Sequence, residues 1–193
     1  MSKRTTLLSA AAIGALALTA NIVAPVSAQD KMKSEMSSEK TVMVGGAAMF
    51  PSKNIIQNAV NSKDHTTLVA AVKAAGLVDT LEGKGPFAVF APTNEAFGKL
   101  PAGTVDTLVK PENKATLTKI LTYHVVPGKL EAKDLTDGKK LKTVEGEELT
   151  VKASSGKVML MDAKGGMSTV TIPDVNQSNG VIHVVDTVLM PAS

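Results

Sequence analysis

The stretch FAVFAPTNEAF, residues 87–97, carries a strand signal and a helix signal in direct succession. Its opening five residues are all apolar, which is typical of a short buried strand. We expect the strand to end at Pro92, because proline has no amide hydrogen to donate to a neighbouring strand. Thr93 or Asn94 can then accept a hydrogen bond from a free amide in the first turn of a helix. Packing and capping thus explain the stretch, and the residues predicted to serve them are Phe87, Phe90, Thr93 and Phe97.

The residues on both sides of this stretch, from Asn54 to about Lys119, repeat their apolar side chains mainly with the period of helices. Asp64 can cap the second of these helices, and Gly76 stands where a helix should stop. Pro111 fits the first turn of the last one. The apolar positions are Ile55, Ile56, Ala59 and Val60; Leu68, Val72 and Ala75; Val105, Leu108 and Val109; and Leu117, Ile120 and Leu121.

After Tyr123 the pattern changes to short β-rich runs, at 149–152, 158–161, 169–172 and 181–189, separated by Gly, Asp and Lys turns. The run Val181–Val185 is almost continuously apolar, as in a strand buried on both faces. His183 shares one face with Val181 and Val185, so we expect a hydrogen-bonded core histidine. Helices first and strands second, with no internal repeat, indicate one α+β domain.

The N-terminus has the layout of a cleavable export signal. Lys3 and Arg4 precede the apolar run Leu7–Ala20, which is shorter than the roughly 20 residues of a membrane-spanning helix. Small residues end the signal, so we expect cleavage between Ala28 and Gln29. The predicted divisions are a signal peptide at 1–28, a disordered polar leader at 29–40 and a single folded domain at 41–193.

Composition narrows the classes of partner. The chain has no cysteine, so the exported protein can have neither a disulfide framework nor a lipid-modified cysteine. Loss of Lys3 and Arg4 lowers the basic residues from 21 to 19 against 18 acidic ones, which reduces the net charge from +3 to +1. With one tyrosine and no tryptophan, the mature chain lacks the basic, aromatic face of a nucleic-acid-binding protein. We also expect no membrane span after processing.

Four polar residues are candidates for recognition, although a structural role explains each of them first. Tyr123 and His124 follow an apolar helical stripe, so we expect a buried ring whose hydroxyl fixes a loop, and a histidine bonded within the fold. Asn94 and Glu95 open the helix after Pro92. The alternative for these two is that they line the edge of a partner-binding surface.

The sequence contains no arrangement typical of an enzyme or a metal site. It has neither a cysteine nor a G-x-S-x-G nucleophile motif. Its histidines, at 65, 124 and 183, do not have metal-ligand spacing, and Met32 and Met36 alone are a weak copper signal. The acidic residues at 145, 147 and 148 fall in a turn-like stretch and are expected to be solvated. We therefore predict a protein that is not an enzyme and that binds no cofactor.

Three segments together resemble the conserved parts of the fasciclin domain: FAVFAPTNEAF at 87–97, TYHVVPG at 122–128 and GVIHVVDTVLMP at 180–191. The resemblance extends over about Val42–Pro191. Within the family, the chain is similar to the small secreted bacterial members. It implies a compact wedge of β-strands packed with several short helices, and a cell-surface or extracellular module. It also implies a role in adhesion for Tyr123 and His124. The chain departs from many members at His65, where they carry an aromatic residue.

The expected function is that of a secreted or periplasmic adhesion module that binds a protein, the extracellular matrix or a cell-surface component. The alternative is a carrier of a small ligand or lipid in the cell envelope, with the ligand held in a groove between helices and sheet.

Overall fold

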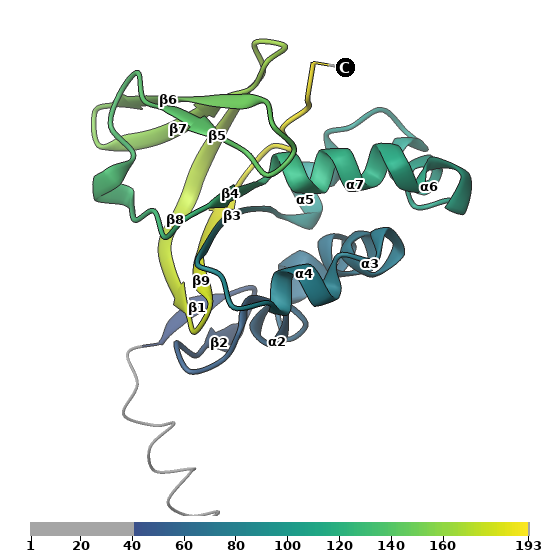
Figure 1. Ribbon diagram of the computed structural model, residues 1–193, viewed down its shortest axis with the longest axis horizontal. Coiled ribbons are helices and arrows are strands. Elements are labelled where there is room, and N and C mark those ends of the chain that lie inside the picture. Colours follow the sequence, from purple (N-terminus) through teal and green to yellow (C-terminus); the bar gives the residue numbers. More distant parts are fainter. Residues whose placement is uncertain (1–40, 193) are drawn as a thin grey trace, which may run out of the picture.

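The computed structural model describes residues 41–192 (Figure 1). The predicted export signal, its cleavage site at Ala28 and Gln29, and the whole of the predicted leader lie outside the described residues.

A seven-stranded sheet with the order β4-β3-β9-β8-β7-β6-β5 forms the centre of the fold. Strands β3 and β9 run parallel, and the other neighbours are antiparallel. The amide of Val144, just after β5, donates to the carbonyl of Val125 in β4 at 2.7 Å, so the two outer strands nearly close the sheet. The strands are β3 (Phe87–Pro92), β4 (Val125–Pro127), β5 (Lys140–Lys142), β6 (Glu148–Ser154), β7 (Lys157–Met161), β8 (Met167–Gln177) and β9 (Gly180–Val185).

Helices gather on one side of this sheet, and a two-stranded hairpin lies at its lower end (Figure 1). The α-helices are α2 (Ile55–Ala59), α3 (Thr66–Ala75), α4 (Val78–Glu82), α5 (Asn94–Gly98), α6 (Thr104–Leu108) and α7 (Lys114–Tyr123). Three short 3-10 helices are η1 (Lys63–His65), η2 (Pro111–Asn113) and η3 (Ala132–Asp134), and the hairpin is β1 (Val42–Val44) with β2 (Ala47–Met49).

Strands β3 and β9 separate two hydrophobic cores. Val89 and Ile182 pack toward the helices, in a cluster with residues such as Leu121. Their neighbours Phe90 and Val181 point the other way, into a cluster enclosed by the curled sheet. All six residues of β9 are buried, so the expected strand with two buried faces is confirmed. The α+β wedge of strands and short helices is confirmed as the fold class.

The expected helices are present, but two of their boundaries differ. Asp64 does not cap α3, because it lies inside η1 and the residue before α3 is His65. Pro111 begins η2 rather than α7. Gly76 ends α3 as expected, with a φ of 73° that glycine adopts without the strain of a Cβ.

The strands differ more from expectation. Strand β3 ends at Pro92 as expected, although it includes this proline, which lies opposite Val185. Strand β9 ends at Val185, although Val188 and Leu189 beyond it are buried as loop residues. The short strands β1, β2, β4 and β5 were not predicted, because runs of three residues show no measurable alternation.

Candidate functional site

Tyr123 ends α7 with its ring fully buried inside the curled sheet. Its hydroxyl donates to the carbonyl of Glu148 at 3.3 Å and accepts from the amide of Ala163 at 3.0 Å. Burial raises the pKa of Tyr123 to about 12, so the hydroxyl stays protonated and keeps both bonds. The tyrosine thus ties the start of β6 to the loop after β7, which supports the structural interpretation.

His124 follows directly and is 2% exposed. Its Nδ1 lies 2.8 Å from the carbonyl oxygen of Ile120, and its Nε2 accepts from the amide of Leu189 at 3.0 Å. Only a neutral ring with its proton on Nδ1 satisfies both partners. Burial lowers the pKa of His124 to about 4, in agreement with a neutral ring. A surface partner has no access to this side chain without a rearrangement of the last buried residues of the chain.

His183 has the opposite arrangement of its ring nitrogens. Nε2 lies 2.7 Å from the carbonyl oxygen of Leu130, while Nδ1 accepts from the amide of Asp174 at 3.4 Å. The ring stacks on Phe90 with 5.5 Å between centroids, and burial lowers its pKa. His183 therefore connects the loop before η3 to the middle of β8, from inside the core.

Asn94 lies at the start of α5 and holds the start of a different helix. Its Oδ1 accepts from the amide of Thr67 at 3.0 Å and from the hydroxyl of Thr66 at 3.2 Å. Its Nδ2 donates to the carbonyl of Lys63 at 2.8 Å. The amide thus supplies, from a distant part of the chain, the cap that no side chain next to α3 provides. Both polar atoms of the Asn94 side chain are therefore used within the fold, where they join the start of α5 to η1 and the start of α3.

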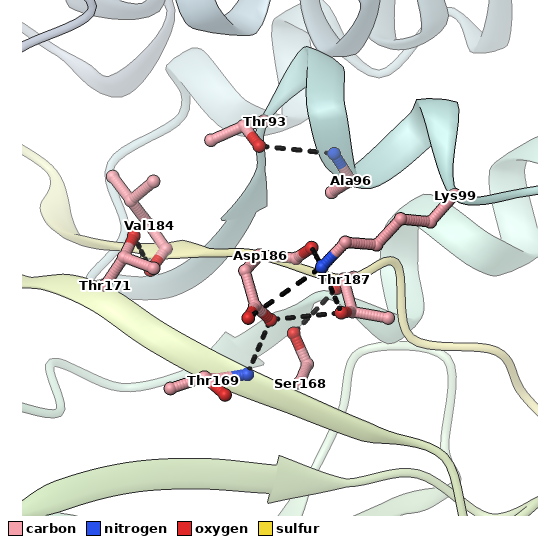
Figure 2. Close-up of polar contacts among 9 residues, drawn as sticks. All are labelled: Thr93, Ala96, Lys99, Ser168, Thr169, Thr171, Val184, Asp186 and Thr187. Atoms are coloured by element: carbon pink, nitrogen blue, oxygen red, sulfur yellow. Dashed lines mark hydrogen bonds and ion pairs between the residues drawn. The ribbon is translucent and has the colours of Figure 1, made fainter.

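Thr93 caps α5 itself, with its hydroxyl accepting from the amide of Ala96 at 3.2 Å (Figure 2). The phenylalanines of the same stretch are buried or half-buried in the two cores. Phe87 and Phe97 face the helices, and Phe90 faces the inside of the sheet. The stretch therefore places side chains in both cores and joins them to the helix layer.

Figure 2 shows a polar group where β9 ends beside α5. Asp186 Oδ1 accepts from the amide of Thr169 at 2.8 Å and from the hydroxyl of Thr187 at 3.0 Å. Lys99 Nζ donates to the carbonyl of Asp186 at 2.7 Å and lies 3.9 Å from its Oδ2. The Lys99 and Asp186 side chains are 54% and 38% exposed, so this group is accessible.

Glu95 is the only one of the four recognition candidates that is exposed among the described residues. It shares the surface of α5 with Lys99, and we name Glu95, Lys99, Asp186 and Thr187 the α5–β9 edge. No motif in the sequence singles out Lys99 or Asp186. The signal present in the sequence is an acidic residue directly after an almost continuously apolar strand, which marks the point where a buried chain returns to the surface.

His65, the departure from the common pattern, is 3% exposed at the start of α3. Its Nδ1 lies 2.9 Å from Ser62 Oγ. The carbonyl of Ala91 favours the protonated ring, but Nε2 has no partner of normal hydrogen-bond geometry. Burial outweighs these contacts and lowers the pKa of His65. The ring is therefore a neutral core residue.

His65 and His124 both border a cavity of about 40 Å³ between the helices and the sheet, with an otherwise apolar lining. A water molecule needs about 10–15 Å³ of such free space, so the cavity has room for a few molecules of that size. An acyl chain does not fit. The cavity therefore gives no support to the lipid-carrier alternative.

Within residues 41–192, no three side chains of His, Asp or Glu come together in a way that could hold a metal ion. In the same part of the chain, no helix has the length and apolar character needed to cross a membrane.

Comparisons with known proteins agree on one family. The model of the fasciclin domain matches residues 63–191. Protein sll1483 of Synechocystis is 50% identical over 155 residues, which cover 80% of this chain and 83% of that protein. The cell surface glycolipoprotein MPB83 of Mycobacterium bovis is 38% identical over 156 residues, covering 77% of this chain and 64% of the relative.

Among solved structures, the FAS1 domain pair of the insect cell adhesion molecule fasciclin I aligns with a TM-score of 0.65. The alignment covers 73% of this chain and 52% of the insect chain, at 20% sequence identity. At this identity the likeness shows the fold alone.

Proposed function

The chain belongs to the fasciclin domain family, and from that premise we propose that it is an exported module that binds a protein or matrix component at the cell surface or in the cell envelope. The match of the family model over residues 63–191 carries this proposal.

The family gives the coarse function. Fasciclin domains are adhesion and binding domains rather than enzymes, and this confirms the prediction that the chain is not an enzyme. The chain is related to cell-surface and adhesion-associated proteins, among them the cell surface glycolipoprotein MPB83.

The geometry of the candidate residues supports binding through the surface. Tyr123, His124 and His183 use their polar atoms within the fold, and Asn94 is committed to the start of α3. Recognition is thereby left to exposed side chains and loops on a rigid scaffold. The α5–β9 edge is one such surface, with an acidic and a basic side chain next to each other.

Capture from the native cell envelope tests the proposal. The mature protein, starting at Gln29, is immobilised and exposed to solubilised envelope and to the medium of the producing cells. We expect reproducible retention of a specific component, and no retention by the same protein after heat denaturation. Repeated capture of nothing above background would count against a binding module.

The export part of the proposal has its own test. We expect intact-mass analysis of the protein from the periplasmic or extracellular fraction to give a chain that begins at Gln29. A full-length chain found in the cytoplasm would contradict it. The same spectrum, recorded under native conditions, would reveal a retained small molecule and so favour the carrier alternative.

A further inference from the structure

Strand β8 divides its length between two neighbours. Its first three residues, Met167–Thr169, pair with β7, and from Val170 onward it pairs with β9. Two register shifts interrupt the pairing with β9, one on each side of Ile172. Such shifts bend a strand and increase its twist, and the pairing of β8 with β7 ends at Thr169, just before the first of them.

Strand β7 is therefore paired unequally on its two sides. All five of its residues pair with β6, but only Met159–Met161 pair with β8. Continuing that register would set Val158 opposite Val170 and Lys157 opposite Thr171, and neither pair forms.

A groove of about 500 Å³ opens where the two strands separate. We name it the β7–β8 groove, and its lining residues are Ala132, Gly156, Lys157, Val158, Thr169, Val170, Thr171 and Pro173. Its volume lies within the range of about 300–1,000 Å³ that is usual for ligand pockets.

The main chain of β7 faces this groove at Val158. Ser154 and Lys157 pair across the two-residue turn Ser155–Gly156, which makes them a hydrogen-bonded pair of the hairpin. Main-chain groups alternate in direction along a strand, so those of Lys157 point to β6 and those of Val158 point to the β8 side. The groove thus has the edge of a strand as one of its walls, at the point where the ladder with β8 stops.

The side chains of the groove combine an apolar floor with a basic rim. Val158 and Val170 are half-buried, and Pro173 adds apolar surface at the far end. Lys157 is exposed at the rim, and no ion pair within residues 41–192 includes it. A strand edge with an apolar floor and a free cation has the chemistry that recognises an extended peptide.

We propose that the β7–β8 groove binds an extended segment of a protein partner, which adds to Val158 as a short strand. The segment sets a small or branched apolar side chain between Val158 and Val170, and an acidic side chain beside Lys157. This inference rests on the proposed binding function and names the surface and the form of the partner.

A library of random seven-residue peptides displayed on phage supplies the probe, selected on the immobilised mature protein. We expect enriched peptides that share an apolar and an acidic residue. Calorimetric titration of one such synthetic peptide should show about tenfold weaker binding to Lys157→Glu, which reverses the rim charge. Lys110→Glu is the matched control, because Lys110 is also exposed but follows α6, at the opposite end of the molecule, and should leave the affinity unchanged (Figure 1).

A second pair of variants tests strand addition itself. Val158→Pro removes the amide that faces the groove without removing a bond to β6, and should abolish binding. Val158→Ala keeps the amide and should bind with a loss of less than about tenfold. Circular dichroism checks that both are folded. In NMR spectra of the wild-type protein, the peptide should shift the amide signals of Val158 and Val170 and slow the exchange of the Val158 amide.

Enriched peptides that bind all four variants equally, or that leave the Val158 and Val170 signals unmoved, would overturn the inference. So would a selection that enriches nothing above an unrelated protein. Capture from the cell envelope shows whether the groove proposal alone is wrong or the proposed binding function is wrong as well. If Lys157→Glu and Val158→Pro capture the same component as the wild type, the groove is excluded and the binding function stands. If the wild type captures nothing, the binding function fails while the peptide result still decides the groove.

Discussion

Three buried histidines show how the same residue type is kept neutral in three different ways. His124 and His183 each have one nitrogen near a carbonyl oxygen and one that accepts from an amide, with the two ring positions exchanged. His65 has one partner and relies on burial alone for its other nitrogen. Burial makes the charged form of each ring less stable than it is in water, and this lowers all three pKa values.

The pKa of His124 makes the stability of the protein depend on pH below neutrality. An unfolded histidine has a pKa of 6.5, and the folded one has a pKa of about 4. Between these values the unfolded state binds a proton that the folded state does not, so stability is complete above pH 6.5 and falls toward pH 4. We expect His124 to contribute a loss of about 3 kcal/mol over this interval.

Urea unfolding at a series of pH values between 7 and 4 measures this loss. The variant His124→Gln lacks the titrating group, so its stability should fall less steeply than that of the wild type over the same interval. The difference between the two slopes removes the contribution of the other titrating groups. Parallel slopes would mean that the pKa of His124 is the same in the folded and unfolded states.

The contribution of the Tyr123 hydroxyl to stability can be measured separately from the contribution of its ring. Tyr123→Phe keeps the packing but leaves the amide of Ala163 without its partner, and should cost about 1–3 kcal/mol. Tyr123→Ala also removes the ring from the core and should cost about 3–5 kcal/mol. Thermal unfolding distinguishes the two. An unchanged melting temperature of Tyr123→Ala with lost partner binding would instead assign this tyrosine to recognition.

At the scale of elements, the junction of α3 and α5 depends on Asn94. Asn94→Ala removes the acceptor for the amide of Thr67, so we expect a loss of about 0.5–2 kcal/mol and faster hydrogen exchange at Thr67. Glu95→Ala, one residue along and exposed, is the matched control and should change stability by less than about 0.5 kcal/mol. Equal stability of the two variants would show that the cap contributes nothing.

The helix caps around Asn94 show which contacts can be predicted from the sequence and which cannot. The residue types after Pro92 predict that Thr93 or Asn94 caps the helix that follows, and Thr93 does cap α5. The cap that Asn94 provides to α3 bridges 27 positions in sequence, and no local pattern contains it. For the same reason Asp64 was the wrong choice as the cap of α3, since it was chosen for its proximity along the chain.

The long, regular elements were predictable because burial imposes a period on them. Helix α7 and strand β9 each carry an unbroken apolar pattern and were placed within a few residues. Strands β4 and β5 have three residues each, which is too short for a measurable alternation, and β4 pairs with β3, a strand far away in sequence. The separation of β7 from β8 could not be predicted from the sequence either. It goes with register shifts between β8 and β9, and these are defined only by the pairing of the two strands in the folded structure.

At the scale of the whole molecule, the predicted polar leader should add nothing to the folded domain. Its sequence QDKMKSEMSSEK offers no apolar side chain beyond Met32 and Met36 for a core. We expect a chain that begins at Thr41 to melt within about 2 °C of one that begins at Gln29, since a small change in stability moves the melting temperature of a chain this size by only a few degrees. Differential scanning calorimetry of the two chains provides the comparison, and a large decrease would show that the leader packs on the domain.

The two hydrophobic cores should unfold as one, because β3 and β9 bury one face in each of them. Loss of either core exposes half of the surface of these strands and removes support from the other core. Leu121→Ala in the helix-side core and Leu149→Ala in the sheet-side core should therefore each lower stability by about 2–5 kcal/mol, with a single transition in both.

Two optical signals follow the cores separately in each variant. The fluorescence of Tyr123, the only tyrosine in a chain without tryptophan, reports on the sheet-side core. Far-UV circular dichroism reports mainly on the helices that pack against the other face. Coincident urea transitions by both signals are expected, since a strand pair that belongs to two cores transmits the loss of one to the other. Separate transitions would instead divide the domain along β3 and β9 into two independent units.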